Sequence, residues 1–125
     1  SDVSVSFEKK QGYRDMRSNA ALAERFAAHL VDLGRAPIMQ DLDVGTGSTD
    51  MGDVSHRVPS LHPWLGICEP GETMCHERAF ATCARSARGM ETMLAAAKSM
   101  ARTAAEVLID APLRERVRAG FASGQ

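Results

Sequence analysis

Strand-forming patterns are confined to two short segments of this 125-residue chain, and their shortage constrains the fold more than any other feature. Residues 2–8 alternate apolar and polar side chains with a period of two, which is typical of a half-buried strand. Residues 61–68, which include Trp64 and Ile67, predict a second, largely buried strand. A complete α/β enzyme domain usually needs more strands than these. We therefore expect the chain to be part of a larger domain.

The first predicted helix follows Ser18 and Asn19, either of which can serve as its N-cap. Gly34 supplies the stop signal at its other end. His29 lies beside the apolar stripe of this helix, so we predict a structural role for it. The stripe itself consists of Leu22, Phe26, Leu30 and Leu33.

The sequence after Glu72 predicts three more helices. Thr73 can cap a helix that carries His76, Phe80 and Cys83 on one face. A longer helix follows, and residues 110–112 (DAP) restart a last helix. The methionines of the longer helix are predicted to belong to the core, because they recur at helical spacing. Its apolar stripe contains Met90, Met93, Leu94, Ala97, Met100, Ala101, Ala104 and Leu108, and the last helix carries Leu113, Val117 and Phe121.

Charge and cysteine content exclude several classes of protein. Lys and Arg number 15 against 16 for Asp and Glu, so there is no excess of basic residues for non-specific binding to nucleic acid. No apolar run approaches the roughly 20 residues that cross a bilayer, so no membrane segment is expected. Three cysteines do not indicate a secreted disulfide framework. We expect a cytoplasmic protein with reduced thiols.

A polar, glycine-rich stretch at 41–60 predicts surface loops, where sites tend to lie. Its run GTGSTDMGD at 45–53 lacks the lysine of a nucleotide-binding phosphate loop, which excludes that function. Backbone N–H groups in such a loop can bind an anion such as a carboxylate. An ordinary surface turn is the simpler alternative.

Cysteine and histidine spacing gives little support to a structural zinc site. The four candidate ligands are Cys68, Cys75, His76 and Cys83. Structural zinc sites pair ligands two to four residues apart, whereas the pattern here is C-x6-C-H-x6-C. We therefore do not predict such a site, and no feature marks a cysteine nucleophile of lowered pKa.

Residues 47–56 (GSTDMGDVSH) and 58–63 (VPSLHP) closely resemble the C-terminal part of metallopeptidase family M-twenty. This family includes aminoacylases, carboxypeptidases and hydrolases of aminobenzoyl-glutamate. The resemblance continues through 75–80 (CHERAF) to 110–112 (DAP). It implies an α/β fold class, with this chain as the helix-rich C-terminal portion of a zinc-peptidase-like catalytic domain that has few strands here. Residues 1–14 would then end the lid domain and its hinge, and 15–125 would belong to the catalytic domain.

The same resemblance implies a site shared with segments outside this chain. His76 matches the last metal-binding histidine of the family, while Ser48, Thr49, Asp50 and His62 match the region that contacts substrate. The family uses two divalent ions, zinc or manganese, whose other ligands match nothing in this chain. Its catalytic glutamate also lies upstream, so no catalytic residue is expected here and the chain alone should be inactive.

The function implied by the resemblance is hydrolysis of the amide bond of small substrates. These are N-acyl amino acids, aminobenzoyl-glutamate or dipeptides, and the family often forms homodimers through the lid domain. The partners implied are therefore a small-molecule substrate and the rest of the catalytic and lid domains. The alternative is a non-catalytic helical module for binding or assembly, which keeps the surface of the family without its chemistry.

Overall fold

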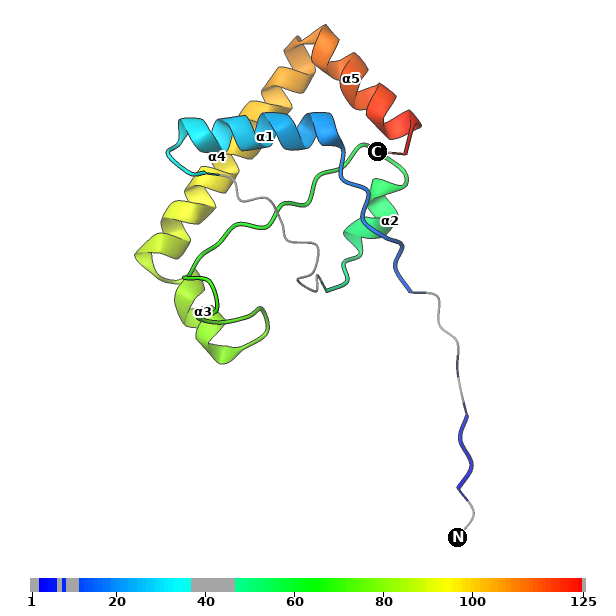
Figure 1. Cartoon of the computed structure of the whole chain (residues 1–125), viewed down its shortest axis with the longest axis vertical. Helices are drawn as coiled ribbons and strands as arrows, with labels where there is room; N and C mark the ends of the chain where they lie inside the picture. The colour runs from blue at the N-terminus through cyan, green and yellow to red at the C-terminus, as the bar shows by residue number, and fades with distance from the viewer. Residues whose placement is uncertain (1–2, 7, 9–11, 37–46, 125) are drawn as a thin grey trace.

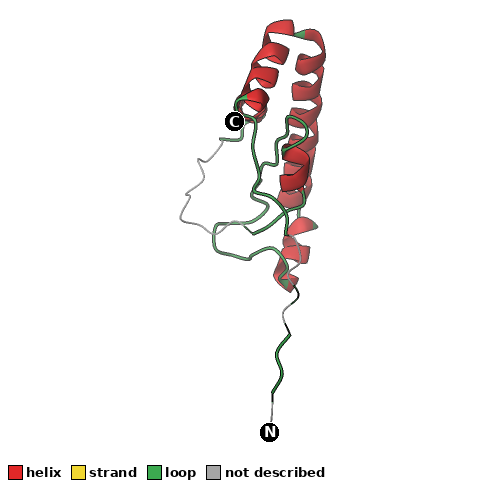
Figure 2. Ribbon diagram, turned by 90° about the vertical axis from the view of Figure 1, so that its right-hand side faces the viewer, coloured by secondary structure: helices red, strands yellow, loops and turns green. Residues whose placement is uncertain are grey.

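The computed structural model describes residues 3–6, 8, 12–36 and 47–124, and it consists of helices joined by loops (Figures 1 and 2). Helix α1 spans Ala20–Asp32, α2 spans Met51–Ser55 and α3 spans Arg78–Ala84. The long helix α4 spans Ala87–Ile109, and α5 spans Ala111–Ala122. Helix α1 lies across α4, and α5 turns back from the end of α4 (Figure 1). The expected abundance of helices is confirmed. Positions 41–46 of the predicted polar stretch lie outside the described residues.

Neither predicted strand is present among the described residues. Residues 3–6 extend away from the helices (Figure 1), and Val3 is 83% exposed, since no strand among the residues that the structure describes pairs with them. The segment 61–68 is a loop, in which Trp64 is 68% exposed. The closest approach to a sheet in the described part of the chain is an isolated parallel bridge between Ser18 and Ser60. Alternating patterns form strands only where a partner strand completes the ladder.

Asn19 is the N-cap of α1, as predicted, and it also joins α1 to two other parts of the molecule. Its side-chain oxygen accepts a hydrogen bond from the Leu22 N–H at 3.2 Å. Its amide nitrogen donates to the Val117 carbonyl on α5 at 2.9 Å, and its backbone N–H donates to Ser60 at 2.9 Å. Gly34 adopts φ of +76° just after the helix, which explains the predicted stop.

The other helix starts are also set by local side chains. Ser86 caps α4 by accepting from the Gly89 N–H, and Asp110 caps α5 by accepting from the Leu113 N–H. Helix α5 begins within the predicted 110–112 segment. The prediction for α3 is wrong, because this helix begins at Arg78 rather than after Thr73. His76 therefore lies in the turn before α3 and does not share its face with Cys83.

The core lies where α1 meets α4, around Phe26, Leu30 and Ala95. Leu61 and Leu65 of the loop before α3 pack against it. The buried residues of α4 are small or polar, namely Gly89, Thr92, Ala95, Ser99 and Thr103. The hydroxyl of Thr103 donates to the Ser99 carbonyl, so this group is satisfied inside the helix. Ala95 lies in the cluster at the α1 contact, whereas Gly89 lies against α3 and Thr92 donates to the Gly66 carbonyl. Small side chains on α4 therefore allow several segments to approach it closely.

The predicted core stripe of α4 is exposed, and that prediction is wrong. Met93 is 56% exposed, Leu94 54% and Met100 59%. With 3.6 residues per turn, Leu94 lies on the side of α4 opposite Thr92 and Ser99, whereas Met93 and Met100 lie at about a right angle to them. The stripe is apolar as predicted, but no described element covers it.

One charged network bridges α1 and α4. Arg25 donates two hydrogen bonds of 2.7 Å to the Glu106 carboxylate, and the pKa of Glu106 falls to about 2. The hydrogen bonds from Arg25 are the main cause of the low pKa, while burial opposes it and His29 adds to it. His29 is buried, as its predicted structural role requires, with Nε2 3.2 Å from Glu106 Oε2.

No helix among the described residues is both long enough and apolar enough to cross a membrane.

Candidate functional site

The run 47–56, which carries the strongest resemblance, folds as a turn followed by the short helix α2. Met51 N–H donates to the Thr49 hydroxyl at 3.2 Å, which opens α2. Gly52 lies against the backbone carbonyl of Arg14, where a Cβ atom would clash. The Ser55 hydroxyl donates to the Gly52 carbonyl at 2.7 Å and accepts from the Arg17 N–H at 3.0 Å. Gly52 and Ser55 therefore anchor 14–17 against α2, a structural role that sequence reasoning missed.

The predicted substrate residues lie in two separate loops. Ser48 and Asp50 are exposed and Thr49 is half-buried in the turn before α2. His62 is exposed in the loop after α2, with its ring centroid 6.2 Å from that of Trp64. These side chains can donate and accept hydrogen bonds toward solvent. Their role in binding substrate stays a prediction.

A small pocket of about 130 Å³ lies beside α2, but none of the predicted substrate residues lines it. Its walls come from the 14–19 segment, α2, the following loop and the end of α5. Lining residues are Arg17, Asn19, Ser55, His56, Pro59, Ser60, Phe121 and Gly124. Because these residues also hold the segments together, the pocket is most simply a packing gap at a junction.

His76 lies in a strained turn directly before α3. Its φ is +75°, which is in the left-handed region and uncommon for a residue other than glycine. The Glu77 carboxylate accepts from the Met74 N–H at 3.1 Å and from the Thr73 hydroxyl at 2.8 Å, which holds this turn. These two bonds lower the pKa of Glu77, that from Met74 more than that from Thr73. The imidazole of His76 is exposed, and its role as metal ligand stays a prediction.

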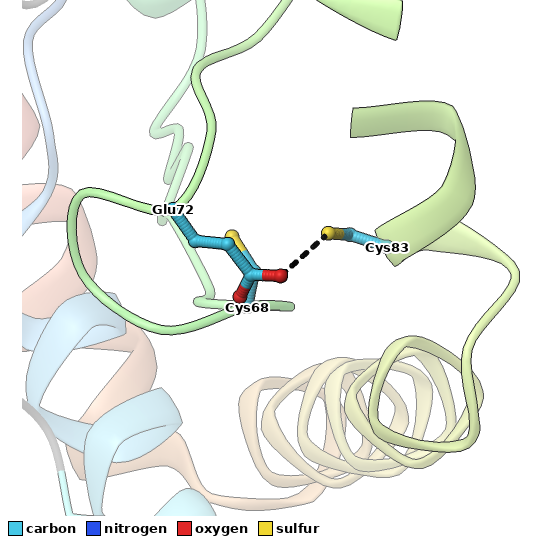
Figure 3. Close-up of side chains that lie close together, drawn as sticks. All are labelled: Cys68, Glu72 and Cys83. Atoms are coloured by element: carbon cyan, nitrogen blue, oxygen red, sulfur yellow. Dashed lines mark hydrogen bonds between the residues drawn. The ribbon is translucent and has the colours of Figure 1, made fainter. Parts of the chain in front are cut away.

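Two cysteines and one glutamate form a separate cluster next to α3 (Figure 3). Cys68 and Glu72 lie on one loop and Cys83 lies in the last turn of α3, and the three side chains point toward one another. One potential ligand atom from each residue lies within 4.8 Å of the other two. Cys83 Sγ donates to Glu72 Oε1 at 3.8 Å. Two of the four candidate zinc ligands named from sequence are thus brought together.

The cluster differs from the sequence hypothesis in two respects. Cys75 and His76 lie outside it, because the turn before α3 carries them elsewhere. Glu72 was missed, although its position four residues after Cys68 places both in one turn. The pKa of the Cys83 thiol is raised by burial and, to a smaller extent, by the negative charge of Glu72 and by Cys68. A metal-free Cys83 is therefore a poor nucleophile at neutral pH.

Comparison with known proteins shows similarity to dipeptidases. The chain is 32% identical over 111 residues to the Xaa-Arg dipeptidase of Mus musculus and 31% identical over 111 residues to that of Homo sapiens. Each match covers 87% of this chain and 25% of the dipeptidase, so the chain spans about a quarter of the length of the curated relatives it matches. No protein-family model matches the sequence, and no solved structure matches it.

Proposed function

We propose that the chain is the C-terminal part of the catalytic domain of a metal-dependent amidohydrolase of metallopeptidase family M-twenty. The observation that carries the proposal is the similarity to Xaa-Arg dipeptidases over 111 residues. Residues 1–14 then end the lid domain and its hinge, and 15–125 belong to the catalytic domain. A dipeptide is the favoured substrate because of the name of these relatives, with N-acyl amino acids and aminobenzoyl-glutamate as further candidates. A cytoplasmic location and a homodimer formed through the lid belong to the same proposal.

His76 is the proposed metal ligand of this chain. Strained backbone at a residue other than glycine is found more often at functional sites, and the carboxylate of Glu77 holds the turn that carries it. An exposed neutral imidazole fits zinc or manganese as one ligand among several. Within the described residues His76 does not belong to any group of three potential ligands. In this proposal most of the ligands of the two ions come from segments outside this chain.

The remaining roles follow from what this chain offers. When bound, the two metal ions supply polarisation of the amide carbonyl and activation of water. Ser48, Thr49, Asp50 and His62 would form part of the substrate wall through their hydroxyl, carboxylate and imidazole groups. The general base, a glutamate in the family, has no counterpart here, so the isolated chain is expected to be inactive.

An apolar groove of about 430 Å³ supports the proposal that this chain is one part of a larger domain. It runs between α1, the 61–63 segment and the exposed side of α4. Its lining residues are Leu22, Phe26, Leu61, Pro63, Met100, Thr103, Ala104, Val107 and Leu108. Apolar surface of this kind is covered in stable domains. We propose that the rest of the catalytic domain packs here.

The same groove favours the second candidate function, a non-catalytic helical module for binding or assembly. A helical surface that exposes a continuous apolar groove suits an amphipathic partner helix. The two functions differ in one measurable property, namely metal-dependent hydrolysis by the complete gene product. Only the enzyme needs further metal ligands and a general base from other segments of that product.

Hydrolysis of an Xaa-Arg dipeptide by the complete gene product, with added zinc or manganese, tests the proposal. We expect activity in the complete protein and none in the 125-residue chain. His76→Ala should lower the bound metal and abolish hydrolysis, because one ligand of the site is lost. Arg78→Ala, at the start of the neighbouring helix, is the matched control and should keep both.

Three outcomes would contradict the proposal. Full activity of His76→Ala at normal metal content removes His76 from the site. Robust turnover by the 125-residue chain means that a base is present in it. A complete protein that hydrolyses none of the three substrate classes favours the helical module.

A further inference from the structure

The cluster of Cys68, Glu72 and Cys83 is separate from the site proposed above and has its own chemistry. Its three potential ligand atoms lie within 4.8 Å of one another. In a tetrahedral zinc site with Zn–S bonds of about 2.3 Å, two sulfurs are about 3.8 Å apart. Small rotations about the side-chain bonds therefore bring all three atoms to a common ion.

The backbone around the cluster holds its members in place. The Glu69 N–H donates to the second oxygen of Glu72 at 3.0 Å, and the Glu72 N–H donates to the Glu69 carbonyl at 3.1 Å. These bonds orient the carboxylate so that its other oxygen faces Cys83. Hydrogen bonds of this kind to a metal-binding carboxylate are typical of well-built sites.

Contacts with α4 join the two halves of the cluster. Arg88 at the start of α4 forms an ion pair with Glu69, on the loop that carries Cys68 and Glu72. The Ser86 hydroxyl donates to the Cys83 carbonyl at 2.7 Å. Gly89 lies so close to α3 that an added Cβ would be 2.5 Å from the Cys83 carbonyl. Loop and helix are thus both anchored on α4.

The charge balance of the cluster favours a cation. Glu72 places a negative charge beside two thiols, and Arg88 is already paired with Glu69. A bound divalent ion reverses the local electrostatics, because it stabilises deprotonated sulfur and carboxylate together. Thiolate ligands select soft or borderline ions such as zinc over magnesium, calcium and manganese.

From this geometry we propose that Cys68, Glu72 and Cys83 bind one thiophilic divalent cation of the zinc class, with water in the fourth position. The cation site uses none of the residues assigned to the dipeptidase-like site. If no cation binds here, the proposed dipeptidase-like function is therefore unaffected. It is a site of the loop–α3 junction, and it would fasten the loop to α3.

Titration of the full, metal-free chain with Cd²⁺ or Co²⁺, in the presence of a phosphine reductant, tests the site. We expect one equivalent to bind, with the ultraviolet charge-transfer absorption of metal–thiolate bonds. Cys68→Ser and Cys83→Ser should each weaken binding at least about 100-fold, since loss of an outer hydrogen-bond partner alone costs 10–100-fold. Glu72→Gln should weaken binding but keep the thiolate absorption.

Two variants serve as controls. Cys75→Ser removes the one cysteine outside the cluster, and His76→Ala removes the ligand of the other proposed site. Both should retain the stoichiometry and the absorption. Binding without thiolate absorption, absorption that depends on Cys75, or Cys68→Ser and Cys83→Ser variants that bind as tightly as the parent chain would each overturn the proposal.

A measurement on the unaltered chain guards against variants that fail to fold. Alkylation of each thiol is followed by mass spectrometry with and without Zn²⁺. Bound zinc should slow the modification of Cys68 and Cys83 and leave that of Cys75 unchanged. Equal protection of all three thiols, or none, contradicts the site.

Discussion

The two sides of α4 reverse the usual distribution of side chains. The buried side carries Thr92, Ser99 and Thr103, whereas the exposed side carries Met93, Leu94 and Met100. The buried side allows close packing against α1 because its side chains are small. The exposed side has the apolar composition of a core, but no segment among the described residues packs over it. This difference teaches that one side of α4 is buried by other described segments, while the apolar side is left exposed by them.

Placing a large side chain on the buried side should have the largest effect. Ser99 is 0% exposed, so Ser99→Met forces α1 and α4 apart and should lower the free energy of unfolding by about 1–3 kcal/mol. Urea unfolding of the full chain measures this. Ser99→Ala is the control and should not destabilise, because the Ser99 hydroxyl has no hydrogen-bond partner among the described residues. A tolerated methionine at 99 would mean that the α1–α4 contact is not close-packed.

Removing the charge of Glu106 should have a smaller effect, and one that depends on pH. The pKa of Glu106 is near 2 in the folded chain against 4.5 ordinarily, so the carboxylate stabilises the fold above about pH 4.5. That contribution is lost as the pH falls from about 4.5 to 2. Glu106→Gln should therefore lower stability at neutral pH, and the difference from the parent chain should vanish toward pH 2.

Unfolding across this pH range compares the two chains directly. Glu115→Gln is the matched control, since its carboxylate pairs with Arg118 on an exposed part of α5. Exposed pairs contribute little, so this variant should follow the parent chain at every pH. A pH-independent loss in Glu106→Gln would show that packing rather than charge joins α1 to α4 at this point.

Changing the exposed side should have the smallest effect in the isolated chain. Met100→Ser replaces a side chain that is 59% exposed, and the free energy of unfolding should change by less than about 0.5 kcal/mol. In the complete protein the same change should be clearly destabilising if another segment covers this side. Equal small effects in both would contradict the proposal that the rest of the catalytic domain packs here.

Local features of the fold were predictable because their causes lie within a few residues. Asn19 caps α1 and Gly34 ends it with a positive φ, both as predicted, and α5 begins within the predicted 110–112 segment. The strand predictions failed for the opposite reason, since a strand needs a partner that the period-two pattern does not supply. The apolar stripe of α4 was identified correctly, but helical periodicity cannot tell what covers it.

The candidate sites divide in the same way. The motif at 47–56 and His76 were found from the resemblance, and similarity to dipeptidases supports the family from which their roles are proposed. The cluster next to α3 required the structure, because Cys68 and Cys83 meet only through the path of the intervening turns. Glu72 carried no signal of its own in the sequence.

The sequence by itself determined α1, α4 and α5, the cap and stop of α1, and the apolar stripe of α4. Hydrogen bonds and periodicity that act within a few turns of one helix are enough for these. Tertiary structure alone decided that α1 packs on the small-residue side of α4. It also decided that Cys83 faces Glu72 rather than His76. Both depend on contacts between residues far apart in the chain. Packing and the course of the loops decide which helix face is buried, and helical periodicity alone does not.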